Sequence, residues 1–325
     1  MAHYLVTGAA GFIASKVTEM LCAAGHTVTG IDNLNDAYDI RLKHWRLNRL
    51  RGLPGFTLIE GDIAHRPTVE GLDTALPDCA AVINLAARAG VRQSTENPWL
   101  YVDTNVTGTL NLLELCKRRG IGKFVLASTS SLYGQNNPMP YREDADTSRP
   151  ISPYAATKKA AEALCYSYHA LTGLDVTVFR YFTVYGPGGR PDMSLFRFVQ
   201  WINEGKPVHV FGDGKQSRDF TYVDDIAKGT ILGLKPLGYQ TINLGSDRPV
   251  VLMEMVHILE ELLGKTAQVD YQPRHPADIT ASWADISRAR ELLGWQPQTD
   301  YLQGLRNLVD WYRENQAWAK DVRTE

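Results

Sequence analysis

The chain has 325 residues and carries 34 Lys and Arg side chains against 36 Asp and Glu side chains, so its formal net charge is -2. This length is enough for one large domain or two modest ones with a substantial buried core. Because the charge is nearly balanced, nothing in the composition favours nucleic acid or an anionic membrane surface as a partner.

The first predicted elements are a strand, a glycine turn and a helix, in the segment HYLVTGAAGFIAS at residues 3–15. This order is the context that a dinucleotide-binding fingerprint requires. Gly8 and Gly11 allow the backbone to turn sharply and to approach a pyrophosphate at the N-terminus of the helix, while Ala14 replaces a third glycine. We expect a cofactor site here that includes Gly8, Gly11, Phe12 and Ile13.

The second predicted strand, residues 27–32, ends in Asp32, a carboxylate that can accept hydrogen bonds from both ribose hydroxyls of a dinucleotide. Asn33 follows it, where an arginine would be needed to neutralise a 2′-phosphate. The pair therefore predicts NAD rather than NADP as the cofactor. The alternative interpretation is an ordinary glycine turn, with Asp32 capping the next helix. The basic stretch at residues 41–51 is interpreted as a helix with a solvated basic face.

Further apolar strands alternate with helical segments through the first half of the chain, at residues 56–60, 80–86, 123–128 and 175–181. This alternation predicts the α/β fold class, with a doubly wound parallel sheet that is Rossmann-like. We expect residues 1–182 to form this cofactor-binding domain, with some later segments returning to it. Residues 183–325 contain shorter elements with many Gly, Pro and Asp residues, and they predict a smaller C-terminal substrate-binding α/β domain.

Two long helical segments, residues 98–119 and 153–172, carry apolar stripes. One interpretation is that both helices cover the sheet, and the other is that they build a homodimer as a four-helix bundle. A third amphipathic segment, residues 302–315, is predicted to be a helix that packs in the core. The stripes of the first two segments include Leu110, Leu113, Leu164 and Tyr168.

Four cysteines, Cys22, Cys79, Cys116 and Cys165, are widely separated, with no CxxC pair or Cys/His cluster. We expect reduced thiols, and neither a disulfide framework nor a metal site. The N-terminal residues pass directly into a strand, and no apolar run reaches the length of a membrane span. These observations favour a cytoplasmic protein with no membrane partner.

The strongest chemical signal is the spacing of Tyr154 and Lys158 in SPYAATKKAAEAL, downstream of a hydroxyl run at residues 128–131. Four residues apart on a helix, the phenol and the ammonium share one face, so the positive charge can lower the pKa of the phenol. We predict that Tyr154 is a base near neutral pH, assisted by Lys158 and Thr129. For Thr129, the alternative is a hydroxyl that satisfies backbone groups at the end of a strand.

These motifs together resemble the extended short-chain dehydrogenase/reductase family over nearly the whole chain. The residues that carry the resemblance are TGAAGF, Asp32, NLAA, the hydroxyl run and Tyr-x-x-x-Lys. Within that family, DNLNDAYD, NLAARAGVR, ASTSSLYG, PISPYAATKKAAE and RYFTVYGPGGRPDM look most like the UDP-glucuronic acid 4-epimerases.

The resemblance implies further cofactor contacts, for which ordinary packing is the alternative. Asp62 and Ile63 would flank the adenine, and Asn105 and Tyr181 would help to place the nicotinamide half. Tyr154 and Lys158 would also touch the cofactor, and the residues that line it would be Leu85, Ala86 and Ala87.

The resemblance implies reversible 4-epimerisation of UDP-glucuronic acid to UDP-galacturonic acid through a 4-keto sugar. In that reaction Tyr154 takes the proton of the 4-hydroxyl, directly or through Thr129, while a hydride passes to NAD and later returns to the opposite face of carbon 4. Relatives that decarboxylate or dehydrate usually carry a glutamate near the position of Ser131. The hydroxyls present here therefore disfavour both of those activities.

Arginines and hydroxyls are the candidates for the UDP-sugar. Arg218 and Arg274 are expected on the diphosphate, although RHPAD here shifts Arg274 by one residue from the usual Arg-x-Gly-Asp pattern. The hydroxyls and Arg190 are expected to hold the uronate, with Arg92 as a weaker candidate, and a solvated surface residue is the competing interpretation for the arginines. The predicted substrate-binding residues are Thr129, Ser130, Ser131, Thr183, Arg190, Arg218, Arg274, Asp278 and Arg92.

Two other functions remain open at this point. A UDP-glucose 4-epimerase, or an epimerase of another UDP-sugar, would keep every catalytic role and change only the carboxylate pocket. A non-catalytic NAD-binding regulatory protein would keep the fold without the chemistry. Such proteins typically lose the tyrosine or the lysine, and this chain retains both Tyr154 and Lys158.

Overall fold

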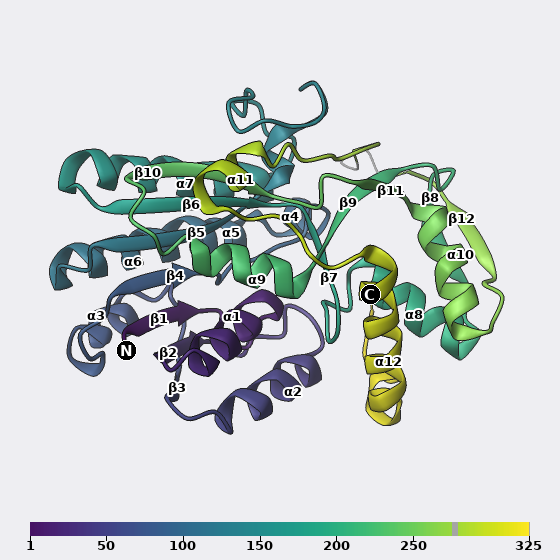
Figure 1. The fold of residues 1–325 in the computed structure, drawn as a ribbon, viewed down its shortest axis with the longest axis horizontal. Coiled ribbons are helices and arrows are strands. Elements are labelled where there is room, and N and C mark those ends of the chain that lie inside the picture. The colour runs from purple at the N-terminus through teal and green to yellow at the C-terminus, as the bar shows by residue number, and fades with distance from the viewer. Residues whose placement is uncertain (275–278, 325) are drawn as a thin grey trace.

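A large parallel sheet organises the first half of the protein (Figure 1). The computed structural model describes residues 1–274 and 279–324. Its seven strands are all parallel and lie in the order β10-β6-β5-β4-β1-β2-β3, which contains the Rossmann order and confirms the predicted fold class. The strands are β1 (His3–Thr7), β2 (Thr27–Asp32), β3 (Phe56–Glu60), β4 (Ala81–Asn84), β5 (Lys123–Thr129), β6 (Asp175–Tyr181) and β10 (Tyr239–Leu244).

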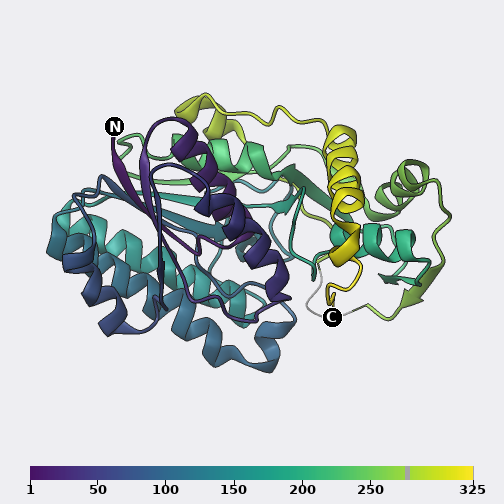
Figure 2. The same ribbon diagram turned by 90° about the horizontal axis from the view of Figure 1, so that it is seen from below.

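Helices cover both faces of this sheet because its strands are apolar on both sides. In β5, Val125 and Ala127 face one helical layer, while Phe124 and Leu126 face the other. Figure 2 shows these two layers on either side of the strands. One layer contains α1 (Phe12–Ala23), α9 (Val223–Leu232) and α11 (Ser287–Leu293), and the other contains α3 (Arg66–Ala75), α6 (Gly108–Arg119) and α7 (Pro153–Thr172).

The predicted helix at 153–172 is confirmed as α7 with the same bounds. The predicted helix at 98–119 is instead divided into α5 (Pro98–Tyr101), a π-helical segment η1 (Val102–Thr107) and α6. A π-turn widens the backbone locally, and such turns are frequent at functional sites. Here the π-turn brings Thr104 to the wall of the main pocket.

Shorter elements follow β6 and gather beyond one end of the large sheet (Figures 1 and 2). Their apolar residues form a separate core, to which the predicted C-terminal helix contributes Leu305, Leu308 and Val309. A three-stranded sheet contains β7 (Thr183–Tyr185), β9 (Ser217–Tyr222) and β11 (Pro249–Val251), and a two-stranded sheet contains β8 (Val208–Phe211) and β12 (Val269–Gln272). The helices here are α8 (Ser194–Glu204), α10 (Leu252–Leu263) and α12 (Tyr301–Ala319).

The remaining elements are α2 (Ile40–Arg51), which packs against α1, and two short helices, α4 (Gln93–Glu96) and η2 (Ser130–Tyr133). In the described part of the chain, no helix is long and apolar enough to cross a membrane. Among residues 1–274 and 279–324, no group of three or more His, Cys, Asp or Glu side chains could hold a metal ion. The four cysteines are free thiols, of which Cys116 and Cys165 are buried.

A buried carboxylate helps to join the two parts of the chain. Asp219 of β9 is 0% exposed, and it accepts hydrogen bonds from the backbone N–H groups of Ser246, Asp247 and Ala284 at 2.5, 3.1 and 3.1 Å. These three residues come from the loop after β10 and from the segment before α11. Asp219 therefore connects the smaller sheet to segments that return to the large one.

We predict that Asp219→Ala lowers the free energy of unfolding by about 3 kcal/mol, because three backbone donors around a buried carboxylate lose their acceptor. Urea unfolding followed by circular dichroism measures this change. Asp310→Ala serves as the control, because the side chain of Asp310 is 65% exposed on α12. Equal stability of the two variants would contradict the role assigned to Asp219.

Candidate active site

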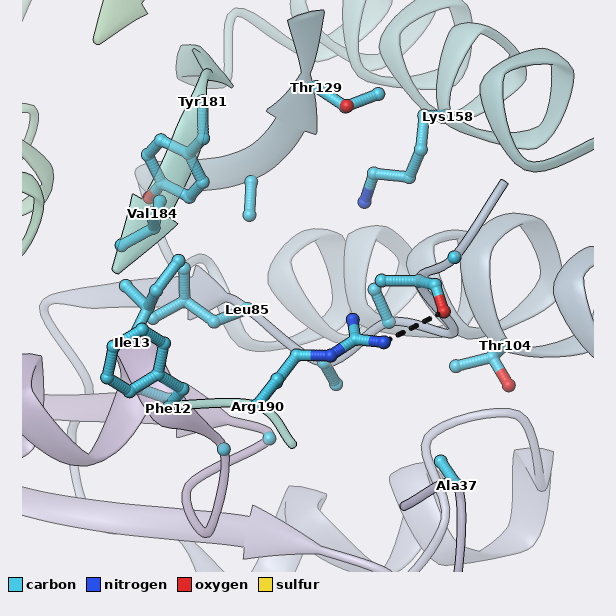
Figure 3. A pocket seen from close by; sticks show the side chains of 18 of the residues that line it. Phe12, Ile13, Ala37, Leu85, Thr104, Thr129, Lys158, Tyr181, Val184 and Arg190 are labelled. Atoms are coloured by element: carbon cyan, nitrogen blue, oxygen red, sulfur yellow. Dashed lines mark hydrogen bonds between the residues drawn. The ribbon is translucent and has the colours of Figure 1, made fainter. Parts of the chain in front are cut away.

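A pocket with a volume of about 380 Å³ opens along the carboxyl ends of the central strands. Figure 3 shows Lys158 and Arg190 pointing into it from different sides. The predicted cofactor residues that line it are Gly8, Gly11, Phe12, Ile13, Asp32, Asn33, Asp62, Ile63, Leu85, Ala86, Ala87, Tyr154, Lys158 and Tyr181. The predicted substrate residues that line it are Thr129, Ser130, Ser131, Thr183 and Arg190.

The glycine turn between β1 and α1 fits a phosphate group. Gly8 has a φ of +68°, and a Cβ atom there would lie 2.9 Å from the Cα atom of Ala86. At Gly11 a Cβ atom would lie 2.7 Å from the carbonyl oxygen of Gly8. Gly11 is also the N-cap of α1, and no side chain caps the first turn of that helix. The N-terminus of α1 therefore presents backbone donors to the pocket, as a pyrophosphate site requires.

Asp32 is held rigidly at the end of β2. Its Oδ2 accepts from the N–H of Ala10 at 3.0 Å, and its Oδ1 accepts from the N–H of Leu34 at 2.8 Å. The ammonium of Lys43 lies 3.3 Å from Oδ1 and also lines the pocket. A carboxylate fixed in this way suits the hydroxyls of a ribose.

The interpretation of residues 41–51 as a helix with a solvated basic face was partly wrong. Lys43 and Arg46 of α2 are 5% and 2% exposed. The guanidinium of Arg46 donates to the carbonyl oxygens of Ala10 and Gly188 at 3.0 and 2.6 Å, so it ties the glycine turn to a distant loop. The spacing carried a signal, because positions 43 and 46 share a helix face with Leu47.

The proposed catalytic residues converge where β5 ends and α7 begins. Thr129 is the last residue of β5, and its hydroxyl accepts from the N–H of Ser131 at 3.1 Å. Tyr154 lies in the first turn of α7, which Ser152 caps by accepting from the N–H of Ala155. Lys158 follows one turn later on the same helix and is 2% exposed. The order strand, turn and capped helix therefore brings the threonine, tyrosine and lysine to one side of the pocket.

The protein's own groups raise the pKa of Tyr154 rather than lower it. Burial causes this increase, while a hydrogen bond with Thr129 and the charge of Arg190 oppose it. Burial also lowers the pKa of Lys158 to about 8, although Cys165 and Glu162 act in the other direction. Arg190 is thus a cation of the chain that favours the phenolate of Tyr154, and the assistance expected from Lys158 stays a prediction.

Arg190 reaches the pocket from a glycine-rich loop, and its guanidinium is paired with a carboxylate. Its Nε and Nη2 donate to the two carboxylate oxygens of Asp192 at 3.0 and 2.5 Å, and Nη2 also donates to the carbonyl oxygen of Ala89 at 3.3 Å. Burial raises the pKa of Asp192, but the charge of Arg190 outweighs this effect and lowers it. Asp192 thereby orients the guanidinium, and sequence reasoning missed it.

The structure places four predicted site residues outside the lining of this pocket. The side chain of Asn105 bonds to the backbone of Arg88 and to Thr157, and it does not line the pocket. Three predicted arginines also lie outside the pocket lining, and Asp278 lies outside the described residues. Arg92 stacks on the ring of Phe211, with its guanidinium carbon 4.0 Å from the ring centroid. Arg218 donates to the carbonyl oxygen of Ile279 at 2.7 Å. Arg274 is exposed.

Comparisons with known proteins agree with this arrangement. The family model described as "NAD dependent epimerase/dehydratase family" matches residues 4–245. A UDP-glucuronate 4-epimerase of Thermodesulfobacterium geofontis is 54% identical over 324 residues, covering 99% of this chain and 100% of the relative.

Two solved structures show the same likeness. The UDP-glucuronic acid 4-epimerase of Bacillus cereus, in complex with UDP-glucuronic acid and NAD, has a TM-score of 0.90 at 36% identity and covers 96% of this chain and 99% of its own. The UDP-glucose 4-epimerase of Thermotoga maritima, with UDP-glucose, has a TM-score of 0.89 at 32% identity and covers 97% of this chain and 99% of its own. The predicted resemblance is therefore confirmed, and the chain belongs to the NAD dependent epimerase/dehydratase family.

Proposed function

We propose that this protein catalyses the reversible, NAD-dependent 4-epimerisation of UDP-glucuronic acid to UDP-galacturonic acid. The observation that carries the proposal is one pocket that holds the Tyr154, Lys158 and Thr129 set together with Arg190. The relatives named above act on the same uronate or on its neutral counterpart. A cytoplasmic location, expected from the sequence, remains part of this proposal.

The chain's residues divide the work of binding the cofactor and moving the proton. The first turn of α1 would hold the pyrophosphate, and Asp32 would accept from the adenosine ribose. When bound, NAD supplies a nicotinamide ring that can accept a hydride and return it. Tyr154 takes the proton of the 4-hydroxyl, directly or through Thr129. It returns the proton after the 4-keto sugar has rotated to present the opposite face of carbon 4. Lys158 supplies positive charge beside the resulting phenolate.

The carboxylate of the sugar has to be restrained, because a 4-keto uronic acid is a β-keto acid. It loses carbon dioxide when the bond to the carboxylate aligns with the carbonyl π system. Thr129, Ser130, Ser131 and Thr183 line the pocket with hydroxyls, and Arg190 adds a guanidinium. We propose that these residues hold the carboxylate out of that alignment, so that all carbons are retained.

The same proposal divides the chain into two domains. Residues 1–182 would bind NAD, together with the returning elements α9, β10 and α11, and residues 183–325 would mainly bind the UDP group. The guanidinium of Arg218 lies on β9 beside the carbonyl oxygens of Ser217 and Ile279, and it would exchange such partners for a diphosphate. Arg274 and Asp278 are proposed as further contacts of the UDP-sugar, Arg92 as a weaker candidate for the uronate, and Asn105 as a residue that helps to place the nicotinamide half.

A homodimer is the further part of the proposal. Of the predicted stripe, Leu113 is in the core and Leu164 and Tyr168 pack against it, while Leu110 stays 36% exposed. Other large apolar side chains on α5, η1 and α7 are also exposed, and we propose that a second copy packing these helices as a four-helix bundle would cover part of them. They are Trp99, Leu100, Val102, Tyr166 and Leu171.

We predict that Tyr154→Phe lowers kcat for UDP-glucuronic acid by about 100-fold or more, because a positioned base is lost. Folding should be retained, since the ring of Tyr154 still packs against Tyr101, whose centroid lies 6.2 Å away. Product formation by NMR and thermal melting measure the two effects. The matched control is Tyr166→Phe on the same helix, and turnover equal to that control would remove Tyr154 from its role.

We predict that Arg190→Gln lowers the ratio of kcat/KM for UDP-glucuronic acid to kcat/KM for UDP-glucose by about 10- to 100-fold, the scale of a lost charged hydrogen bond. The ratio is informative because any effect on Tyr154 acts on both sugars alike. Arg218→Gln is the control, since its proposed diphosphate contact is common to both substrates. An unchanged ratio would favour a neutral UDP-sugar as the substrate.

We predict that the double variant Trp99→Glu, Leu110→Glu shifts the protein from dimer to monomer, because two charges would be buried in the proposed interface. Light scattering after size exclusion gives the mass directly. Tyr271→Glu on β12, where the tyrosine is 55% exposed, is the control and should leave the mass unchanged. A monomeric wild type would refute this interface.

A further inference from the structure

We propose that Glu162 and Arg180 are positioning residues for the reaction. They hold α7 and the ends of β5 and β6 in the arrangement that brings Tyr154 and Lys158 to Thr129. The inference rests on the proposed function, because this arrangement matters chemically only if these three residues act on a sugar hydroxyl.

The two side chains form a buried ion pair that touches each catalytic element. Glu162 lies one turn after Lys158 on α7, and both side chains of the pair are 5% exposed. The Oε1 atom of Glu162 accepts from the hydroxyl of Ser128 at 2.6 Å and from Nε of Arg180 at 3.0 Å, while Oε2 accepts from Nη2 of Arg180 at 2.9 Å. Ser128 immediately precedes Thr129 on β5.

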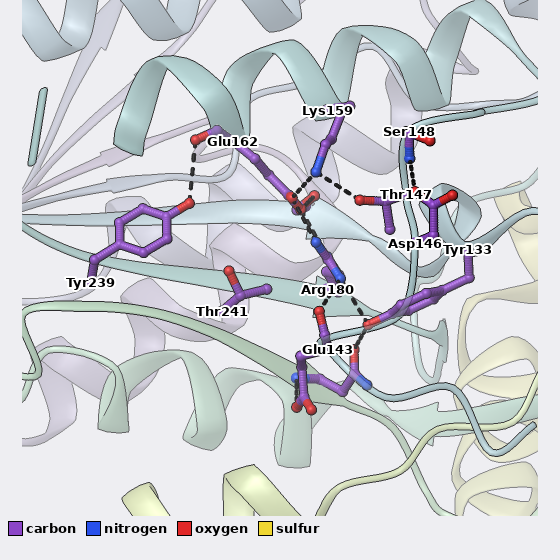
Figure 4. A network of polar contacts seen from close by, with 12 residues as sticks. Tyr133, Glu143, Asp146, Thr147, Ser148, Lys159, Glu162, Arg180, Tyr239 and Thr241 are labelled. Atoms are coloured by element: carbon purple, nitrogen blue, oxygen red, sulfur yellow. Dashed lines mark hydrogen bonds and ion pairs between the residues drawn. The ribbon is translucent and has the colours of Figure 1, made fainter. Parts of the chain in front are cut away.

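Arg180 extends these contacts to two further segments (Figure 4). It immediately precedes Tyr181, which lines the pocket. Its Nη1 donates to the hydroxyl of Tyr133 and to the carbonyl oxygen of Glu143, both at 3.1 Å. The hydroxyl of Tyr133 donates in turn to Oδ1 of Asn243 on β10 at 2.6 Å. One guanidinium therefore joins α7, β6, η2 and β10 behind the catalytic residues.

Stability alone does not account for such a pair. Removing two charges from water is costly, and apolar residues of similar volume often stabilise a fold as well or better. What the pair provides is directional contact, because the fork of an arginine matches a carboxylate in one geometry. Its place, next to Thr129 and one turn from Lys158, is where a small displacement would matter most.

The charge of Glu162 supports the same role. Burial lowers the pKa of Lys158 to about 8, and Cys165 and Glu162 counteract this decrease. Tyr154 is faced by Thr129, by Arg190 and by the ring of Tyr101. Glu162 therefore acts on Lys158 through its charge. It acts on the position of Thr129 through its hydrogen bond with the neighbouring Ser128.

The chain contains a matched control for the pair. Lys123 and Asp175 form an ion pair between the first residues of β5 and β6. The side chain of Lys123 is 9% exposed, so this pair is also buried on one side. It lies five residues from Ser128 along β5, which is roughly 16 Å at the rise of a strand. The two pairs differ in their distance from the pocket and in burial, since the side chain of Asp175 is 20% exposed and that of Glu162 is 5% exposed.

The test compares Glu162→Gln with Asp175→Asn, two changes of a carboxylate to an amide. We expect Glu162→Gln to lower kcat for UDP-glucuronic acid by roughly 10- to 100-fold while KM changes less than about threefold, because orientation rather than substrate binding is lost. Asp175→Asn should lower the melting temperature and leave kcat within about twofold of wild type. Equal kcat values for the two variants would overturn the inference.

A double variant, Glu162→Gln with Arg180→Met, separates positioning from stability. It leaves no uncompensated buried charge, so the melting temperature should recover relative to Glu162→Gln, while kcat should stay low. Recovery of kcat together with the melting temperature would assign the pair a structural role only.

A readout without substrate distinguishes this inference from the proposed function. Crystal structures of Glu162→Gln and Asp175→Asn should show the hydroxyls of Tyr154 and Thr129 displaced relative to each other only in the first variant. Unchanged positions in both variants would refute the positioning role even if the wild type epimerised UDP-glucuronic acid. Conversely, a wild type that is inactive on every UDP-sugar would refute the proposed function. The crystal structures of the two variants would then still decide whether Glu162 positions Tyr154 and Thr129.

Discussion

The active site depends on an ammonium group that has been taken out of water. Lys158 is 2% exposed, and burial lowers its pKa to about 8 while burial also raises the pKa of the Tyr154 phenol. Both changes favour uncharged side chains, whereas the proposed proton transfer needs a cation beside a phenolate. The surrounding charges therefore have to compensate for burial. Cys165 and Glu162 do so for the lysine, and Arg190 does so for the tyrosine together with a hydrogen bond to Thr129.

Most of the fold follows from local patterns because both faces of the parallel sheet are buried. Its strands are short apolar runs, and the predicted ranges 56–60 and 175–181 coincide with β3 and β6. The same holds for α7, which begins at a capped Pro153 and ends before Gly173 in a left-handed conformation. The π-turn within the predicted helix at 98–119 has no comparable signal, because Gly108, which directly follows the turn, is a residue that ordinary helices also tolerate.

Charged side chains inside the protein were the part that local patterns could not predict. Arg46 was assigned to solvent, yet its guanidinium bonds to Gly188, which is 142 residues away in the sequence. Whether a charge can be buried depends on a partner brought near by the fold, and spacing along one helix does not reveal that partner. Asp192 and the Glu162–Arg180 pair were missed for the same reason, although each lies within a few residues of a predicted site residue.

The carboxylate of Asp192 limits how strongly the pocket can select an acidic sugar. Arg190 already forms a two-point pair with Asp192, so a substrate carboxylate would share the guanidinium with a second anion. The remaining contacts are hydroxyls such as Thr129 and Thr183, and these can bind charged and neutral sugars alike. Selectivity for a uronate therefore rests on Arg190 and on the angle at which its guanidinium holds the carboxylate. That angle also decides whether the 4-keto sugar keeps its carboxylate, so substrate choice and carbon retention depend on the same few side chains.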